Sequence, residues 1–181
     1  DLEVNANRPD AMSVSGVARD LAAKLGVPFS FPDYSYASSG LAVADEANIE
    51  IIDPSLCGRF LARTIHGVTI GTSPRWMQQR LIALGMRPIN SVVDISNYVM
   101  LELGQPNHTY DLATVPGGQI KVRRAHEGEQ MTTLDGVERS LVPGDGVIAN
   151  GDDVAIGLAS VMGGAETEIG EADEKGSCDT G

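Results

Sequence analysis

Cysteine, histidine and aromatic residues are scarce in this sequence of 181 residues. With 4% aromatics, a hydrophobic core has to rest on Val, Ile, Leu and Ala. The two cysteines, Cys57 and Cys178, are too few for a disulfide framework or a zinc knuckle, and both are interpreted as cytosolic thiols. The three histidines, His66, His108 and His126, lack metal-ligand spacing and no HExxH helix is present, so no metal site is predicted.

Long apolar runs are also missing. No run approaches about 18 consecutive apolar residues, which argues against a membrane-spanning helix, and no basic segment precedes an apolar one as in a secretory signal. The composition, 42% hydrophobic and 21% charged, is that of a soluble globular protein. We therefore expect a cytoplasmic protein without a membrane partner. Because the chain begins at Asp1 instead of Met, it is expected to be a fragment.

Basic residues are outnumbered, with 13 Lys and Arg against 25 Asp and Glu and a net charge of −12. A domain that grips nucleic acid by its phosphates presents a basic face, so this charge argues against DNA as a partner. If the chain meets RNA, another module has to hold the body of the RNA, and a terminal group alone can enter here. Binding of tRNA by the isolated domain is therefore expected to be weak.

The first half of the sequence carries helical patterns. Apolar residues at helical spacing predict a helix from Val14 to Leu25, with Asp10 or Ser13 as its N-terminal cap and Gly26 at its end. A second helix is predicted to open with a capping serine and a proline, and a third to span residues 94–103. Their expected caps and ends are Ser73-Pro74 and Gly85 for the second helix, and Asp94 and Gly104 for the third.

Strand patterns dominate after residue 117. Asp135-Gly136 is a strong signal for a two-residue hairpin turn, and the polar run at residues 150–153 is a second turn between strands. The predicted strands cover residues 48–53, 59–69, 119–125, 130–134, 137–141, 147–149 and 154–160. The acidic end, residues 166–181, is interpreted as a loop or as a strand that is cut short.

The predicted helices lie mainly in the first half of the sequence and the predicted strands mainly in the second half. This order favours an α+β fold over alternating βαβ units. Residues 28–40 contain two prolines and several serines, which is typical of an irregular linker. We therefore predict an N-terminal helix and linker over residues 1–46, followed by the main domain over residues 47–181 with a truncated C-terminal end.

Two kinds of catalytic site find little support in the sequence. Cys57 stands near Arg59, which could lower the pKa of a thiol, but an ordinary cysteine at a strand edge is the simpler interpretation. Ser160 lacks the Gly-x-Ser-x-Gly elbow of a nucleophilic serine. The glycine-rich run VMGGAETEIG has no lysine in P-loop register. Its Gly163 and Gly164 either form a turn that needs positive φ or make room for a ligand against the backbone.

Polar residues gather around the third predicted helix. Asn97 is expected inside that helix, His108 in the loop that follows Gln105-Pro106, and Arg87 just after the preceding helix. Each also has an ordinary interpretation: an amide bonded to its own backbone, a structural histidine, and a cation at a helix end. From the residues alone, the sequence predicts a pocket here and no particular reaction.

Several long motifs in this chain resemble the editing region of the bacterial phenylalanyl-tRNA synthetase beta subunit. They cover nearly the whole chain and stand in the family's order, beginning with NRPDAMSVSGVARDLAAKLG at residues 7–26 and resuming at CGRF from residue 57. The longest match is PRWMQQRLIALGMRPINSVVDISNYVMLELGQPNHTYD, and it is followed by GEQMTTLDG and IGLASVMGG.

The resemblance implies an α+β, three-layer domain with a β-sandwich-like core and flanking helices. It also implies proofreading, in which tyrosine wrongly attached to the phenylalanine tRNA is removed by hydrolysis of the ester. Carried over by motif, His108 would position water or the terminal ribose, Asn97 would hydrogen-bond the substrate, and Arg87 would hold the terminal adenosine or its phosphate. Gly163 would keep the pocket open, and its neighbour Gly164 is included in the substrate-binding set.

One departure concerns the acidic residue that reads the tyrosine hydroxyl in this family. It usually lies in a run like VLLE, whereas this chain ends in EADEKGSCDTG, where counting from Gly163 places Asp179 near that position. The resemblance further implies the acylated 3′ end of the tRNA and the synthetase alpha subunit, in a heterotetramer, as partners. This fragment needs no cofactor, whereas the full synthetase is expected to use ATP and Mg for ligation.

Two alternatives stay open at the level of sequence. The domain could be a structural or subunit-contact module of the synthetase whose editing pocket has decayed, which the altered tail favours. It could also be a related module of another RNA enzyme, because this type of fold occurs in a tRNA-modifying ligase. The extended QPNH and VMGG matches argue against the second alternative.

Overall fold

The computed structural model describes residues 2–38, 40–165 and 178–180, the last three by their backbone. The chain divides into two compact units, each built from separate stretches of sequence. We call Asp1–Ser39 with Gly71–Asn107 the helical unit, and Gly40–Ile70 with His108–Gly181 the sheet unit. The predicted domains, residues 1–46 and 47–181, are continuous stretches of sequence, unlike these two units. The predicted boundaries stay a prediction.

Helix α1 of the helical unit spans Val14–Leu25, as predicted from its apolar spacing. The Oγ atom of Ser13 accepts a hydrogen bond from the Gly16 N–H at 3.0 Å, so Ser13 is the N-terminal cap. Gly26 ends the helix in the left-handed conformation, with φ of 66°. Asp10 lies in the short 3-10 helix η1, Pro9–Ala11, and pairs with Arg8 and Arg19 instead of capping α1.

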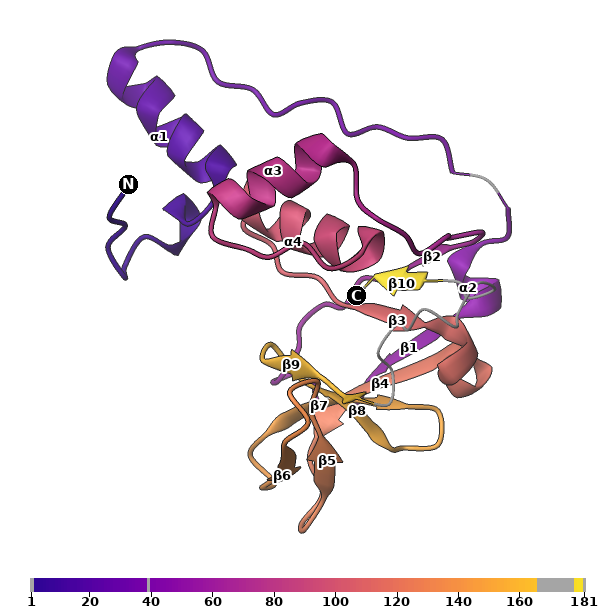
Figure 1. The fold of residues 1–181 in the computed structure, drawn as a ribbon. Helices are drawn as coiled ribbons and strands as arrows, with labels where there is room; N and C mark the ends of the chain where they lie inside the picture. The colour runs from indigo at the N-terminus through magenta and orange to yellow at the C-terminus, as the bar shows by residue number, and fades with distance from the viewer. Residues whose placement is uncertain (1, 39, 166–177, 181) are drawn as a thin grey trace. The chain divides into compact units, whose positions relative to one another are not determined.

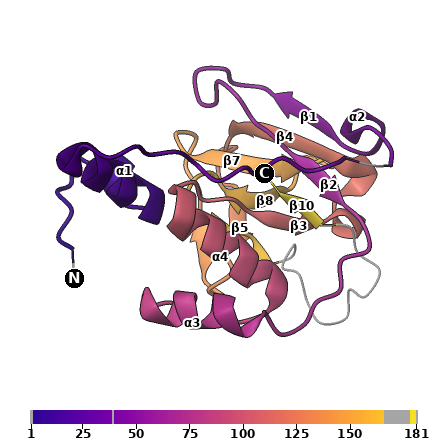
Figure 2. The same ribbon diagram turned by 90° about the horizontal axis from the view of Figure 1, so that it is seen from above.

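Helices α3, Arg75–Ala83, and α4, Ser91–Leu103, lie side by side in the helical unit (Figure 2). Leu81, fully shielded from solvent, and Met77 form the buried side of α3. In α4, Val92 is buried, and Gly104 ends the helix at φ of 78°, as predicted.

Both predicted caps in this region are wrong. Helix α4 begins three residues earlier than expected, and the Asn90 side chain accepts hydrogen bonds from the N–H groups of Val92 and Val93 at 3.1 and 3.0 Å. The Asp94 carboxylate is buried within the helix, where it accepts bonds from the Ser73 hydroxyl at 2.5 Å and the Ile89 N–H at 2.8 Å. Ser73 and Asp94, the two expected caps, therefore bond to each other, and α3 begins after Pro74 without a side-chain cap.

Replacing Asn90 by Ala is expected to lower the stability of the helical unit by about 1 kcal/mol, the usual cost of losing a cap. The variant Asn90→Asp is the matched control, because aspartate caps as well as asparagine and should stay close to wild type. Urea unfolding followed by the fluorescence of Trp76, the one tryptophan of the chain, measures both. An unchanged midpoint for Asn90→Ala would mean that the cap seen here contributes nothing.

The sheet unit is built on a five-stranded mixed sheet in the order β1-β4-β7-β8-β9 (Figure 1). Strand β1 runs parallel to β4, with Ile49 opposite Ile120, and the other neighbours are antiparallel. The strands are β1 Asn48–Ile51, β4 Gln119–Arg124, β7 Gly146–Asn150, β8 Ala155–Leu158 and β9 Met162–Gly163. Short helices α2 Val43–Glu46, η2 Leu112–Thr114 and η3 Pro116–Gly118 connect parts of this unit.

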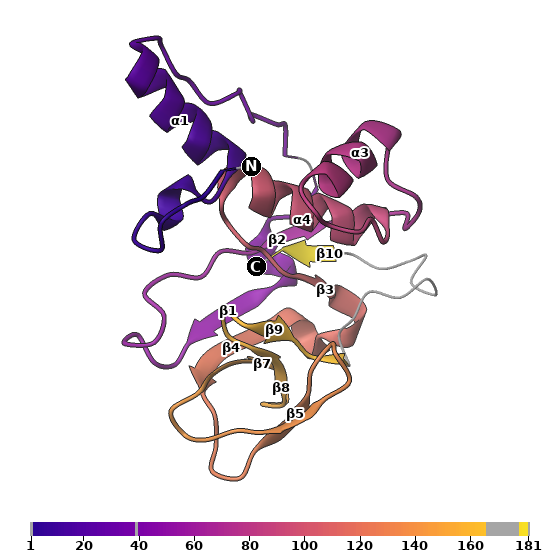
Figure 3. The ribbon, with the colours of Figure 1, turned by 60° about the vertical axis from the view of Figure 1, so that its left-hand side comes forward.

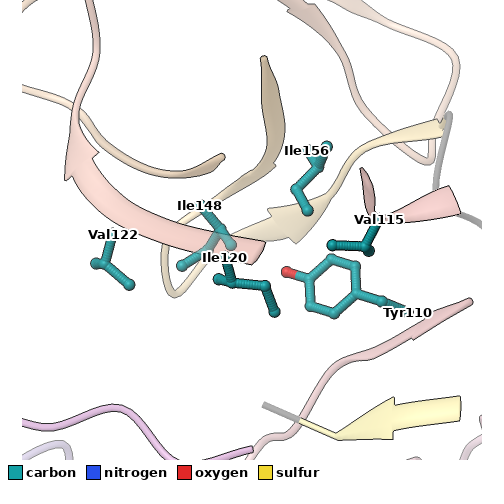
Figure 4. Close-up of a cluster of buried hydrophobic side chains, with 6 residues drawn as sticks. All are labelled: Tyr110, Val115, Ile120, Val122, Ile148 and Ile156. Carbon is teal, nitrogen blue, oxygen red and sulfur yellow. The ribbon is translucent and has the colours of Figure 1, made fainter. Parts of the chain in front are cut away.

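One face of this sheet carries the main hydrophobic core of the unit. Figure 4 shows the Tyr110 ring beside Ile120, Ile148 and Ile156, with its hydroxyl directed toward the sheet. The core follows the composition: among the described residues, Tyr110 is the one aromatic member of the buried cluster, and a partly buried Phe60 packs against it. The buried cluster consists of Tyr110, Val115, Ile120, Val122, Ile148 and Ile156.

A hairpin of strands β5, Gln130–Thr132, and β6, Glu138–Ser140, forms where Asp135-Gly136 predicted one. Its loop is longer than two residues, because the Thr133 N–H donates to the Val137 carbonyl at 3.1 Å and closes a loop of Leu134, Asp135 and Gly136. Gly136 adopts φ of 74°, the left-handed position that three-residue hairpin loops require.

A second, three-stranded sheet has the order β2-β10-β3 (Figure 3). Strand β2 covers Arg63–Ile65, shorter than the predicted strand, and β3 covers Thr109–Asp111. Strand β10, Cys178–Thr180, is antiparallel to both, so a strand is present near the end of the chain. Residues 166–177 of the acidic end, including Gly170, lie outside the described residues. The predicted α+β class is confirmed by this set of helices and sheets.

Candidate functional site

His108 immediately precedes strand β3, and its imidazole lies against the ring of Tyr110. The two ring centroids are 4.6 Å apart and the planes meet at 70°, an edge-to-face contact. Tyr110 is buried at 3% exposure, and its burial raises the pKa of its phenol. Burial also lowers the pKa of His108, because the charged imidazolium is poorly solvated there. His108 is therefore neutral at physiological pH, with ring nitrogens able to donate one hydrogen bond and accept another.

Gly163, in strand β9, packs directly against this imidazole. A Cβ atom at Gly163 would lie 2.2 Å from Cε1 and 2.4 Å from Nε2 of His108, and 3.2 Å from Cδ1 of Leu134. No carbon atom can approach another group so closely, so any side chain here displaces His108. Gly163 does not adopt positive φ. The alternative of a turn that needs positive φ is therefore wrong for this glycine, and its small size serves the space that His108 occupies.

Gly164 is a glycine for a different reason. A Cβ atom there would lie 2.7 Å from the backbone oxygen of Ile156, and the Gly164 N–H donates to that same oxygen at 2.8 Å. The close approach of strand β8 thus requires glycine at position 164. Gly164 also bridges to Thr133. Adjacent in sequence, the two glycines have separate roles, one beside the histidine and one between strands.

The hairpin loop between β5 and β6 closes the site from another side. The Leu134 N–H donates to the Gly163 carbonyl at 3.0 Å. Thr133, fully buried, donates its hydroxyl to Asp135 at 2.5 Å and accepts from the Arg139 guanidinium at 3.0 Å. These bonds fix the loop beside His108. Tyr110 and Leu134 escaped the sequence interpretation, although the spacing of His108 and Tyr110, two residues apart where β3 begins, was a usable signal.

Arg87 and Asn97, the other predicted site residues, belong to the helical unit. Arg87 is exposed beyond the end of α3, and Asn97 is half-buried in the middle of α4. Neither side chain makes a hydrogen bond or ion pair with any residue in the described ranges, so Asn97 is not bonded to its own backbone. His108, Gly163 and Gly164 belong to the sheet unit, where His108 and Gly163 are in contact. A pocket that unites the two sets stays a prediction.

The alternative chemistries find no geometric support. The Cys57 thiol donates to the Arg59 carbonyl at 3.3 Å, as an ordinary cysteine does. Ser160 adopts φ of 61° in the turn between β8 and β9. Two of the histidines pair with carboxylates, His66 with Glu46 at 2.7 Å and His126 with Asp153 at 3.0 Å.

Among residues 2–38, 40–165 and 178–180, no three His, Cys, Asp or Glu side chains gather as metal ligands. In the same part of the chain, every helix is too short or too polar to cross a membrane.

Asp179 lies in strand β10, where the backbone register sets it opposite Tyr110 on one side and Thr64 on the other. Tyr110 itself contacts His108, so β10 pairs with the strand that His108 immediately precedes. Whether Asp179 replaces the acidic residue that the resemblance implies stays a prediction.

Residues 56–175 match the B3/4 domain. The phenylalanine–tRNA ligase beta subunit of Nitratidesulfovibrio vulgaris is 47% identical over 171 residues, and that of Dehalococcoides mccartyi is 50% identical over 171 residues. Each alignment covers 94% of this chain and 21% of the relative, so the chain spans about a fifth of the length of these proteins.

Among solved structures, an N-terminal fragment of the phenylalanyl-tRNA synthetase beta subunit from Pyrococcus horikoshii aligns with a TM-score of 0.48 and 15% identity. The alignment covers 96% of this chain and 52% of that one. The family match includes the site residues Arg87, Asn97, His108, Gly163 and Gly164. The resemblance to the phenylalanyl-tRNA synthetase beta subunit is confirmed, and the chain belongs to the B3/4 domain family.

Proposed function

We propose that this chain is the editing domain of a phenylalanine–tRNA ligase beta subunit and hydrolyses tyrosine from mischarged phenylalanine tRNA. The observation that carries the proposal is the contact of His108 with Gly163, two residues that the motifs assign to one editing pocket and that lie far apart in sequence. The curated relatives are phenylalanine–tRNA ligase beta subunits, which supports the substrate. The rival, a structural module with a decayed pocket, predicts no reason for a histidine to occupy the space beside Gly163.

An editing site compensates for the limited selectivity of the site that attaches the amino acid. Tyrosine differs from phenylalanine by one hydroxyl, and an apolar pocket rejects an added hydroxyl poorly. A second site that hydrogen-bonds the phenol can select tyrosine, because phenylalanine would leave its polar groups unpaired. In this proposal Asn97 hydrogen-bonds the substrate, Arg87 holds the terminal adenosine or its phosphate, and Asp179 is a candidate to read the hydroxyl.

The reaction that fits these residues is attack by water on the ester carbonyl. The bond between that carbonyl carbon and the ribose oxygen breaks, and the released ribose oxygen takes up a proton, so that tyrosine and free tRNA result. A neutral His108 can orient the attacking water or the terminal ribose through its ring nitrogens. Cys57 and Ser160 make no nucleophile–base pair, so a covalent intermediate is not required.

Replacing His108 by Ala is expected to slow tyrosyl-tRNA hydrolysis by the assembled synthetase by at least about tenfold, while attachment of phenylalanine persists. The matched control is His126→Ala, because His126 is exposed and pairs with Asp153 away from the Gly163 contact. Deacylation of purified tyrosyl-tRNA measures both variants. Equal rates for His108→Ala and wild type would contradict the role given to His108.

The pH dependence offers a further check of the same role. Because burial lowers the pKa of His108, the neutral imidazole persists below the ordinary value of 6.5 and is lost only at lower pH. As the pH falls, the His108-dependent part of hydrolysis should therefore decline with a midpoint below pH 6.5. A decline that is half complete at pH 6.5 or above would contradict the lowered pKa of His108.

The wider setting is also proposed from the relatives. In the full synthetase the partners would be the alpha subunit and the acylated end of the tRNA, with ATP and Mg serving ligation in other modules. Because the chain carries a net charge of −12, other parts of the enzyme would hold the body of the tRNA. Such an enzyme works in protein synthesis in the cytoplasm, and this chain alone would attach no amino acid.

A further inference from the structure

The exposed side of helix α3 is positively charged, whereas the chain as a whole is negatively charged. From Gly71 to Val93 the sequence contains three arginines, Arg75, Arg80 and Arg87, and no acidic residue, although the whole chain carries −12. The neighbouring helix α4 adds two carboxylates. Asp94 is buried and hydrogen-bonded, and Glu102 lies beside Tyr34. The surface of α3 is thus locally positive.

An exposed tryptophan lies on this positive surface. Trp76, the one tryptophan of the chain, is 49% exposed, and Arg80 follows it one helical turn later on the same face. The Arg80 guanidinium lies 5.3 Å from the centroid of the indole and donates a hydrogen bond to the Tyr98 hydroxyl. Tyr98 in turn contacts the indole edge-to-face, with centroids 5.4 Å apart.

These contacts hold the indole in one orientation while half of its surface stays exposed. Arg80 is held by its cation–π contact and by Tyr98, so little side-chain freedom is lost when a planar group stacks on Trp76. Arg75, beside Trp76 in sequence, is exposed and makes no ion pair with the described residues, whereas Arg8, Arg19, Arg123, Arg124 and Arg139 are all paired with carboxylates.

We infer that the α3 face around Trp76 is a docking site for single-stranded RNA, with the indole stacking on a base and Arg75 contacting a phosphate. Single-stranded nucleic acids are bound in this way, by an aromatic platform beside basic side chains. A protein partner with an acidic surface would use the arginines and leave the indole without a planar group to stack on. The choice of RNA over DNA rests on the proposed function, whereas the site itself rests on the geometry of α3.

Titration of this chain with a single-stranded RNA of about 12 nucleotides tests the inference. Base stacking should quench the fluorescence of Trp76, which reports this face alone because the chain has no other tryptophan. The dissociation constant should be weaker than about 1 μM, since the net charge opposes binding. Inorganic polyphosphate, which carries the charge without bases, should cause little quenching.

Variants separate stacking from charge, with binding followed by anisotropy of a labelled RNA. Trp76→Ala should weaken binding by at least about fivefold, while Trp76→Phe, which keeps a ring, should recover part of the loss. Arg75→Gln should reduce the slope of log affinity against log salt by about 0.7, the share of one phosphate contact. Arg19→Gln, which removes a paired arginine on α1, is the control that should leave the slope unchanged.

Three outcomes would overturn the inference. The first is absence of quenching at low salt up to about 1 mM RNA, and the second is binding that is unaffected by Trp76→Ala. The third is polyphosphate that binds as tightly as RNA, which would mean attraction by charge alone. None of these readouts involves hydrolysis, so a failure here leaves the editing proposal standing. A failure of editing leaves the stacking site on α3 standing and removes the reason to prefer RNA over DNA.

Discussion

Replacing Gly163 by Trp is expected to lower the rate of tyrosyl-tRNA hydrolysis by at least about 100-fold while phenylalanine attachment persists. The reason is steric, because a Cβ atom alone would lie 2.2 Å from the His108 ring, and an indole would fill the space that the imidazole and the substrate need. Misplacement of a positioning group by about 1 Å can cost a hundredfold in rate. Deacylation of tyrosyl-tRNA and aminoacylation with phenylalanine, measured on the same enzyme preparation, give the two rates.

The matched control for this prediction is Gly144→Trp. Gly144 is exposed, has no neighbour within 4 Å of an added Cβ, and does not adopt positive φ, so tryptophan fits there without strain. This variant should hydrolyse tyrosyl-tRNA like wild type. Gly163→Ala should lie between wild type and Gly163→Trp, because a methyl group shifts the imidazole without filling the site. Full hydrolysis by Gly163→Trp would remove the basis for placing the pocket beside His108.

Replacing Arg123 by Met is expected to lower the free energy of unfolding of the sheet unit by about 3–5 kcal/mol. The Arg123 side chain is 4% exposed, and its guanidinium bonds both oxygens of Glu129 at 2.9 and 2.8 Å and the Asp153 carboxylate at 2.8 Å. Removing the arginine leaves Glu129, itself largely buried, without its partner. Urea unfolding followed by circular dichroism measures the loss, since Trp76 reports the helical unit.

Arg124 supplies the control, because it follows Arg123 in strand β4 and its side chain is exposed. Its ion pair with Asp53 is on the surface, so Arg124→Met should cost no more than about 1 kcal/mol. The double variant Arg123→Met with Glu129→Gln should lose less than the sum of its parts, since the uncompensated charge is gone. If Arg123→Met and Arg124→Met lowered the free energy of unfolding equally, burial of the Arg123 ion pairs would not explain their expected contribution to stability.

The same network sets the acid stability of the sheet unit. The hydrogen bond from Arg123 holds the pKa of Glu129 below its ordinary value of 4.5. A lowered pKa in the folded state means that the contribution is fully present above pH 4.5 and is lost as the pH falls through the folded value. In Arg123→Met this decline should shift to higher pH, and the stability difference from wild type should shrink in acid.

Local patterns predicted the elements well where the deciding contacts are local. Helix α1 has its cap, apolar spacing and terminal glycine within one short segment, and both ends were predicted from the sequence. Helix α4 was predicted to start too late, because Asn90 and Asp94 are both capping residues and the pattern cannot choose between them. The bond from Ser73 to Asp94, which decides the choice, joins residues that the fold brings together.

The candidate site depends even more on contacts between residues that are distant in sequence. Gly163 and Gly164 are indistinguishable as neighbours in VMGG, yet one packs against His108 and the other against the Ile156 backbone. Those partners lie just before strand β3 and in strand β8, far from VMGG in the sequence, so no local pattern separates the two roles. The burial of Arg123 also escaped prediction, because charged residues usually face water and its partners lie on a turn and a distant loop.

The most direct test of the editing proposal is the rate at which the wild-type synthetase that carries this chain hydrolyses tyrosyl-tRNA and phenylalanyl-tRNA, both made on the phenylalanine tRNA. We expect tyrosyl-tRNA to be deacylated well above its spontaneous rate and faster than phenylalanyl-tRNA. Hydrolysis of tyrosyl-tRNA at the spontaneous rate would contradict the proposal and leave the domain a structural part of the synthetase.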